Sequence, residues 1–204
     1  MSWIETLKKF FPTIVLGIFK PKSLLSIWRQ ENHESVLSPT RLVAIETFLV
    51  ALIFYAQKRI GVYKDKWGAF EKFAESESSK LIFDAVSSIL PATAVWISIV
   101  IIAFFVGFNW KKALRIAAIS NPIGLILTPI FVVFSLTRSD VFHSSLVNLS
   151  QGLIGIIYLT IGFKEEKKCS TIKAIGFSFA GMVLTIIVMT LFISLWGFFV
   201  YTLN

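Results

Sequence analysis

Five long apolar segments constrain the fold of this chain more than any other feature of its sequence. They lie near residues 40–57, 84–108, 113–136, 141–163 and 172–200. A helix needs about 20 predominantly apolar residues to cross the hydrocarbon core of a bilayer, and these segments are of that order or longer. The sequence therefore predicts an all-α fold, a polytopic integral membrane helix bundle with about five transmembrane helices.

The composition favours the same class of protein. Of the 204 residues, 55% are hydrophobic and only 16% are charged, whereas soluble domains average about 25% charged residues. The single cysteine, Cys169, excludes an intrachain disulfide and a cysteine-based zinc site. The net charge of +8 is carried mostly between the apolar segments, so the expected partner is an anionic lipid surface and not a nucleic acid.

The first 37 residues differ from the rest and predict a cytoplasmic, interfacial amphipathic segment, followed by a five-helix transmembrane domain over 38–204. Near its start, Trp3, Phe10 and Phe11 are expected to enter lipid while neighbouring lysines face the headgroups. The transmembrane domain begins with Ser38 as helix cap and Pro39 in the first helical position. The candidate contacts to anionic lipids are Lys8, Lys9, Lys20, Lys22, Lys111, Lys112 and Arg115.

The distribution of basic residues predicts the orientation. Five spans place thirteen of the 20 Lys and Arg residues on the side of the N-terminus. Cytoplasmic loops are enriched in Lys and Arg, so we expect a cytoplasmic N-terminus and a C-terminus outside. The favoured location is a bacterial plasma membrane, or an endomembrane if the chain is eukaryotic. The basic link over 58–83, in which we expect a short amphipathic helix, opposes this orientation.

Signatures of catalysis are missing from the sequence. It contains no H-E-x-x-H, G-x-S-x-G, Walker or Rossmann glycine motif. His33 stands near Glu31 and Glu34, where a solvated polar surface is a simpler interpretation than a metal site. We therefore expect no enzymatic activity, no catalytic residues, no cofactor and no bound metal.

Glu46 is the clearest ionisable residue inside an apolar segment, and such residues are functional candidates by default. The favoured interpretation is a carboxylate near the membrane boundary that pairs with Arg29, Arg41 or Arg115. A proton or cation ligand is the alternative.

Small and amide side chains suggest helix contacts in the last two segments. One helical face of the fourth segment carries Ser144, Asn148, Gln151, Gly152 and Gly155. Such residues are the usual contacts between membrane helices, so packing is favoured over a lined cavity. Gly176 and Ala180 in the fifth segment predict close packing in the same way.

The stretch "AISNPIGLILTPI" places two prolines in the third segment. Inside a helix, each proline leaves the carbonyl four residues back without its donor. Asn121 precedes Pro122 and Thr128 precedes Pro129, and a side chain at each of these positions can fold back to the freed carbonyl. The sequence predicts a twice-kinked helix that repairs itself, with a hinge or a binding site as the alternative.

The order of these features resembles the Yip family of small five-span membrane proteins, especially its bacterial members. The resemblance rests on "IFKPKSLLSIW", on "FFVGFNWKKALRIAAISNPIGLIL" and on "LIGIIYLTIGFKEEKKCSTIKAIGFSF". It implies a non-enzymatic adaptor, organiser or accessory subunit. The Asp-Leu-Tyr-Gly-Pro signature of the eukaryotic members is absent, so small-GTPase binding is not carried over.

Two functions remain at this point. The first is a membrane protein that binds other membrane proteins or itself, as adaptor or accessory subunit of a complex. The second is a small transporter or channel with a polar cavity between the first, third and fourth spans, lined by Glu46, Asn121, Asn148 and Gln151.

Overall fold

The chain was analysed as a computed structural model that describes residues 3–31, 33–59, 77–127, 130 and 141–202. Every regular element in these ranges is an α-helix, which confirms the predicted all-α class for this part of the chain. The helices are α1 (Trp3–Phe19), α2 (Pro21–Arg29), α3 (Pro39–Arg59), α5 (Glu77–Phe105), α6 (Trp110–Ala118), α8 (Val141–Lys167) and α9 (Thr171–Thr202). Residues 121–127 are also helical.

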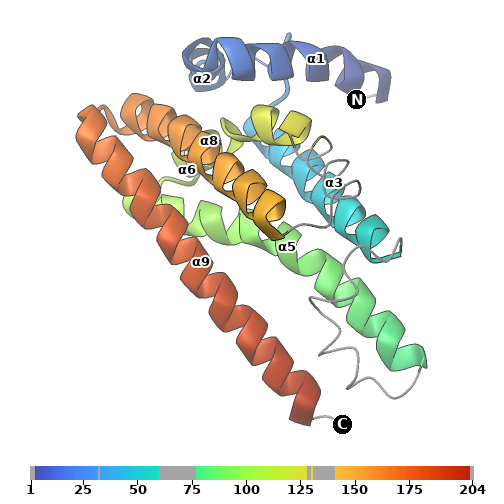
Figure 1. Cartoon of the computed structure of the whole chain (residues 1–204). Coiled ribbons are helices and arrows are strands. Elements are labelled where there is room, and N and C mark those ends of the chain that lie inside the picture. Colours follow the sequence, from blue (N-terminus) through green and yellow to red (C-terminus); the bar gives the residue numbers. More distant parts are fainter. Residues whose placement is uncertain (1–2, 32, 60–76, 128–129, 131–140, 203–204) are drawn as a thin grey trace.

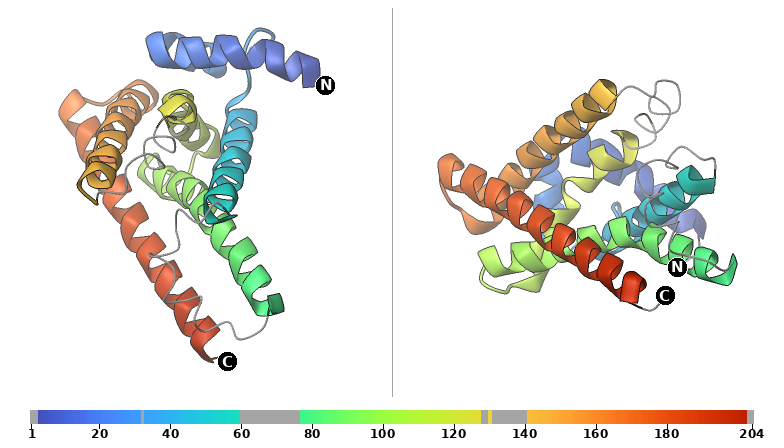
Figure 2. Two further views of the ribbon diagram at one scale, coloured as in Figure 1. Left: turned by 45° about the vertical axis from the view of Figure 1, so that its right-hand side comes forward. Right: turned by 60° about the horizontal axis from the view of Figure 1, so that its bottom comes forward.

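The helices α1 and α2 lie across one end of a bundle built by the other helices (Figures 1 and 2). Starting at this end, α3 and α9 run away from it, whereas α5 and α8 run back toward it (Figure 1). Helix α5 packs against both α3 and α9, and α8 packs along α9. The N-terminus therefore lies at the end covered by α1 and α2, and the C-terminus at the opposite end.

Helices occupy most of the predicted spans, but fewer of these helices qualify as membrane crossings. Among the described residues, α9 alone is long and apolar enough to cross a bilayer, over Thr171–Phe192, while Ala92–Phe105 in α5 is a shorter apolar stretch. Helices α3 and α8 carry polar residues along their length, including Glu46 and Asn148. The structure thus shows one candidate span within a helical bundle.

The third apolar segment is not the continuous kinked helix that the sequence predicts. Helix α6 ends at Ala118, residues 119–120 form a turn, and a new helix occupies 121–127. Pro122 therefore lies in the first turn of a helix, where the backbone N–H groups have no intrahelical acceptor in any case. The prediction that Pro122 breaks a helical hydrogen bond is wrong, because the chain has already ended one helix and starts another.

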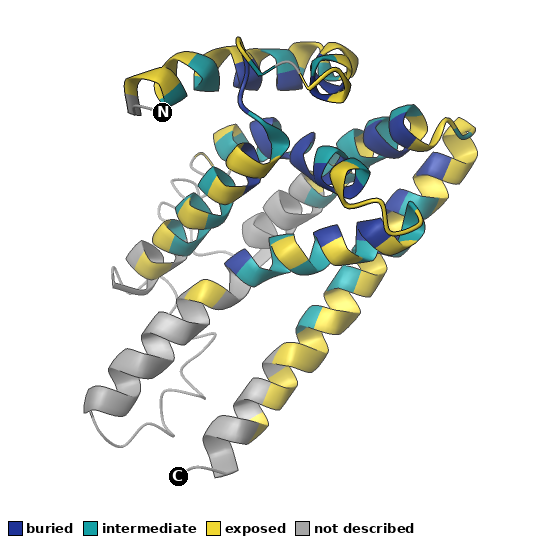
Figure 3. Ribbon diagram, turned by 180° about the vertical axis from the view of Figure 1, so that it is seen from behind, coloured by how far each residue is buried: buried dark blue, intermediate teal, exposed yellow. Residues whose placement is uncertain are grey.

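The best-packed part of the bundle lies directly beneath α1 and α2 (Figure 3). Trp28 is 1% exposed, and its indole N–H donates to the carbonyl of Leu37 at 2.8 Å. The N–H of Leu37 in turn donates to Thr13 Oγ1 at 2.8 Å, and that hydroxyl donates to the carbonyl of Lys9 at 2.6 Å. These bonds join the segment that leads into α3 to both N-terminal helices.

Helix caps explain where α3 and α9 begin. Ser38 Oγ accepts the N–H of Arg41 at 3.4 Å and Pro39 starts α3, as predicted. Helix α9 is capped by Ser170, whose hydroxyl accepts the N–H of Lys173 at 3.4 Å. The amphipathic helix expected within 58–83 falls largely outside the described residues.

Candidate functional site

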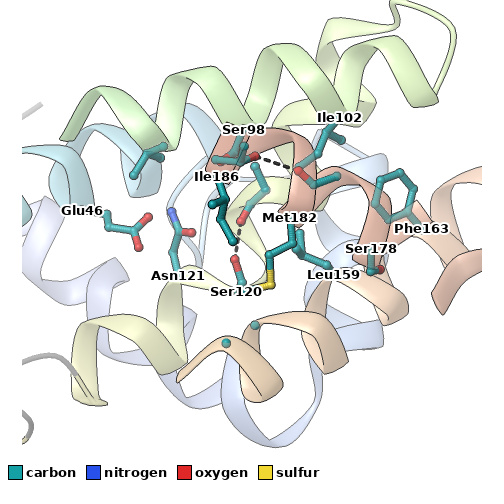
Figure 4. Close-up of a pocket in the computed structure, with 16 residues that line it drawn as sticks. Glu46, Ser98, Ile102, Ser120, Asn121, Leu159, Phe163, Ser178, Met182 and Ile186 are labelled. Carbon is teal, nitrogen blue, oxygen red and sulfur yellow. Dashed lines mark hydrogen bonds between the residues drawn. The ribbon is translucent and has the colours of Figure 1, made fainter. Parts of the chain in front are cut away.

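A partly open cavity of about 310 Å³ lies between α3, α5, α8, α9 and the turn that follows α6 (Figure 4). Its volume is at the lower end of the range of small-molecule sites, about 300–1,000 Å³. The polar side chains of its lining are Glu46, Ser98, Ser120, Asn121, Ser178 and Thr185. The larger apolar side chains are Val95, Ile102, Leu159, Phe163, Met182 and Ile186.

Glu46 and Asn121 lie next to one another at one end of this cavity (Figure 4). Glu46 projects from the second turn of α3, and Asn121 begins the helix that follows the break at 119–120. The residue Asn121 is 3% exposed, yet its Nδ2 has no hydrogen-bond partner, and neither has the buried Oε2 of Glu46. Buried polar atoms without partners are rare and costly, so this pair marks the polar end of the cavity as a candidate site.

The hydroxyl groups of Ser98, Ser120 and Thr185 line the cavity and bond to backbone carbonyls. Ser98 donates to the carbonyl of Ala94 at 2.8 Å, and Thr185 donates to that of Gly181 at 2.8 Å. The two hydroxyl oxygens lie 3.3 Å apart, and either can donate to the other in place of its carbonyl. Ser120 donates to the carbonyl of Ala117 at 2.9 Å. The three oxygens can therefore also act as acceptors.

Two glycines of α8 differ, because Gly152 lies close to α9 as predicted, whereas Gly155 leaves open space in the cavity. Gly152 and Gly155 both line it. A Cβ at Gly152 would lie 3.0 Å from Met182 Cε, whereas a Cβ at Gly155 would meet nothing within 4 Å. In α9, a Cβ at Gly176 would also meet nothing within 4 Å, so the close packing predicted there is wrong.

Two of the four residues predicted to share a polar cavity, Glu46 and Asn121, are brought together. The side chains of Asn148 and Gln151, and the residues Thr128 and Pro129, lie outside the described part of the chain. The predicted repair role of Asn121 is not what the structure shows, because its Nδ2 donates to no carbonyl.

Pro122 has a packing role that the sequence did not indicate. A Cβ at Gly17 of α1 would lie only 2.3 Å from Cγ of Pro122. The two helices therefore approach closely only because position 17 is a glycine. The hydroxyl of Tyr158 adds a second contact to α1 by donating to the carbonyl of Ile18 at 3.0 Å.

An ionic cluster at the covered end of the bundle occupies the arginines that were expected to pair with Glu46. Arg115 binds Glu166 through two hydrogen bonds, Nε to Oε1 at 2.9 Å and Nη2 to Oε2 at 2.8 Å. Arg29 Nε donates to the same Oε1 at 3.1 Å. The pairing of Glu46 with Arg29 or Arg115 is thus wrong. The only signal in the sequence for the true partner is the acidic pair within "FKEEKK".

The candidate lipid contacts divide into exposed and engaged cations. Lys8 and Lys20 are exposed, and Lys22 is exposed but lies 3.5 Å from Glu165 Oε1. The side chain of Arg115 is only 12% exposed in its ion pair with Glu166. Further lysines have protein partners: Lys9 Nζ donates to the carbonyl of His33 at 2.8 Å, and Lys111 Nζ lies 2.6 Å from Glu31 Oε1. Lys112 is half-buried.

Helix α1 nevertheless keeps an exposed apolar face. The exposed apolar residues on it are Ile4, Leu7, Phe11, Val15 and Phe19. Phe10, which we expected in lipid, packs against the core instead. This face and the exposed lysines have the character of an interfacial helix.

Of the residues considered as metal ligands, Glu31 pairs with Lys111. The hydrogen bond and charge of Lys111 lower the pKa of Glu31, and burial is the main cause that lowers the pKa of His33. Within the described ranges, no group of three His, Cys, Asp or Glu side chains is placed to hold a metal ion.

Comparison of the chain with protein families, with curated proteins and with solved structures found no match. The resemblance to the Yip family therefore stays a prediction.

Proposed function

We propose that this chain is an integral membrane protein that binds a small polar solute inside its helix bundle and passes it across the bilayer, as a transporter or channel does. The observation that supports this function is the cavity between the helices with two partnerless polar atoms, Glu46 Oε2 and Asn121 Nδ2. A cavity that served packing alone would be expected to be apolar or to have its polar groups satisfied.

The proposal includes the five-span topology expected from the sequence, with the basic end of the bundle in the cytoplasm. In support of it, the basic segments around α2, α6 and the α8–α9 turn gather at one end, where their side chains meet. The termini lie at opposite ends (Figure 1), which suits an odd number of crossings.

Proteoliposome swelling tests the proposed function. Vesicles with the full chain are mixed with isosmotic amines, polyols, sugars, amino acids or carboxylates, and solute entry is followed by light scattering. We expect at least one class to enter faster than into protein-free vesicles. Gly155→Leu should abolish the entry, because its side chain projects into the open cavity, whereas Gly176→Leu adds the same group to α9 outside it. Equal entry in both variants, or no entry of any solute class, would contradict the proposal.

A second candidate function is the adaptor or accessory subunit implied by the Yip resemblance. It is favoured by α9, of which only 11% of the apolar stretch is buried inside the chain. Lipid or another membrane protein must cover the exposed remainder. Extraction in a mild detergent, followed by size-exclusion chromatography with light scattering, tests this candidate. A stoichiometric complex supports it, and a monomeric chain contradicts it.

A further inference from the structure

The polar end of the cavity lacks one hydrogen-bond donor and one acceptor. Oε2 of Glu46 accepts no hydrogen bond, and Nδ2 of the 3% exposed Asn121 donates none. The two side chains are neighbours at this end (Figure 4). A ligand that complements both must carry a donor for the carboxyl group and, close to it, an acceptor for the amide.

The donor that best suits this position is a cation. A carboxylate in a low-dielectric site binds a charged donor more strongly than a neutral one. None of the described residues that line the cavity is a Lys, Arg or His. Arg29 and Arg115 are engaged with Glu166. The positive charge opposite Glu46 is therefore left for a ligand to supply.

The surrounding hydroxyl groups favour an ammonium group in particular. Ser98, Ser120 and Thr185 donate to backbone carbonyls, so their oxygens can act as acceptors in the cavity. An ammonium group has three N–H donors and no acceptor, which matches a cavity whose polar lining offers a carboxyl group and hydroxyl oxygens.

The rest of the lining fits an apolar body. Beyond the polar end, the cavity is bordered by aliphatic side chains and by Phe163, which lies at the side opposite Glu46 (Figure 4). A bare inorganic cation would leave most of the 310 Å³ unfilled. A branched alkyl group fills such a volume and removes its own surface from water.

We propose that the cavity binds a small primary amine with a hydroxyl or carbonyl group next to the ammonium-bearing carbon and with a branched apolar body. The ammonium group binds Glu46, the neighbouring oxygen accepts from Asn121, and the body points toward Phe163. This inference rests on the proposed function, since it names the class of solute that the cavity takes.

Calorimetric titration of the full chain in phosphatidylcholine nanodiscs tests the inference, because zwitterionic lipid does not attract amines as anionic headgroups do. The probes are leucinol, 4-methylpentan-1-ol, which lacks the amine, and 4-methylpentan-2-amine, which lacks the hydroxyl. We expect leucinol to bind at least about tenfold more tightly than the alcohol, as befits a hydrogen bond to a charged group. It should also bind more tightly than the amine that lacks a hydroxyl.

Two variants assign the contacts. Glu46→Gln should weaken the binding of leucinol by about tenfold and leave the affinity for 4-methylpentan-1-ol unchanged. Asn121→Leu should remove the preference for leucinol over 4-methylpentan-2-amine. The matched control is Glu34→Gln, which removes the same charge from an exposed position outside the cavity lining and should leave all three affinities unchanged. Circular dichroism of each variant verifies its fold.

Several results would overturn the inference: no binding of leucinol, equal affinity for the alcohol, displacement of leucinol by sodium chloride at constant ionic strength, or no loss in Glu46→Gln. These results are separable from a failure of the proposed function. A non-amine solute whose entry is blocked by Gly155→Leu but not by Glu46→Gln would refute the amine class and retain the transport function. Solute entry that is unchanged in Gly155→Leu would refute both the amine class and the transport function.

Discussion

Replacing Glu166 by glutamine tests how the N-terminal helices are held on the bundle. The Glu166 side chain is 2% exposed and accepts three hydrogen bonds, two from Arg115 and one from Arg29. Its neighbour Glu165 is 27% exposed and lies 3.5 Å from Lys22 and 3.6 Å from Arg29. The two carboxylates therefore offer a buried and a partly solvated ion pair at adjacent positions.

The burial of the partners sets the size of the expected effect. Arg115 is 12% exposed, so Glu166→Gln leaves a charge that water reaches poorly, and breaking such a pair costs about 3–5 kcal/mol. Arg29 is 35% exposed and keeps its ion pair with Glu165, which limits its contribution to the loss of stability. We expect a loss of about 3 kcal/mol in the free energy of unfolding. Glu165→Gln should cost less than about 1 kcal/mol, as surface pairs do.

Denaturation in mixed micelles with increasing dodecyl sulfate, followed by circular dichroism, measures both losses. Hydrogen exchange of α2 provides a second measurement, because Glu166→Gln should speed exchange there more than Glu165→Gln does. If the two variants lose equal stability, the reasoning from burial is refuted. A double variant with Arg115→Leu should recover part of the loss, since it removes the unpaired charge.

Four further variants address other contacts. Gly17→Ala should lower the free energy of unfolding by about 1–3 kcal/mol, because its Cβ would collide with Pro122. Gly176→Ala meets open space and should raise the free energy of unfolding by up to about 1 kcal/mol. Denaturation with dodecyl sulfate measures both changes. Asn121→Leu should leave the stability of the ligand-free protein unchanged or raise it, because it removes a partnerless buried amide; a large loss would show that Asn121 has a partner. Burial lowers the pKa of His33 from its usual 6.5, so just below that pH the unfolded chain binds more protons than the folded one. The stability of the wild type should therefore fall from pH 7.5 to 5.5 more steeply than that of His33→Gln. Parallel stability profiles would exclude His33 as the cause.

The helices were largely predictable because local sequence determines them. Pro39 and the apolar run after it start α3 where expected, and α9 begins within one residue of its predicted start. The break at 119–120 was not predictable from the proline alone. Pro122 is equally compatible with a kinked helix interior and with the first turn of a new helix, and the turn at 119–120 shows that the second applies.

The candidate site was predictable in part. Glu46 and Asn121 were recognised because polar groups in apolar segments are conspicuous. Ser98 and Thr185 were missed, since an isolated hydroxyl in an apolar helix is usually satisfied by its own backbone and leaves no pattern. The partner of Arg115 was assigned to the wrong carboxylate because charges near helix ends look alike until the ends are placed together in space.

The ion pair between Arg29 and Glu166 joins residues 137 positions apart. A growing chain therefore completes α1 and α2 long before the carboxylate that fastens α2 is synthesised. In the membrane arrangement that we propose, the exposed apolar face of α1 would meet the bilayer surface during that interval. The amphipathic pair would then reach the interface first, and the bundle would assemble beneath it.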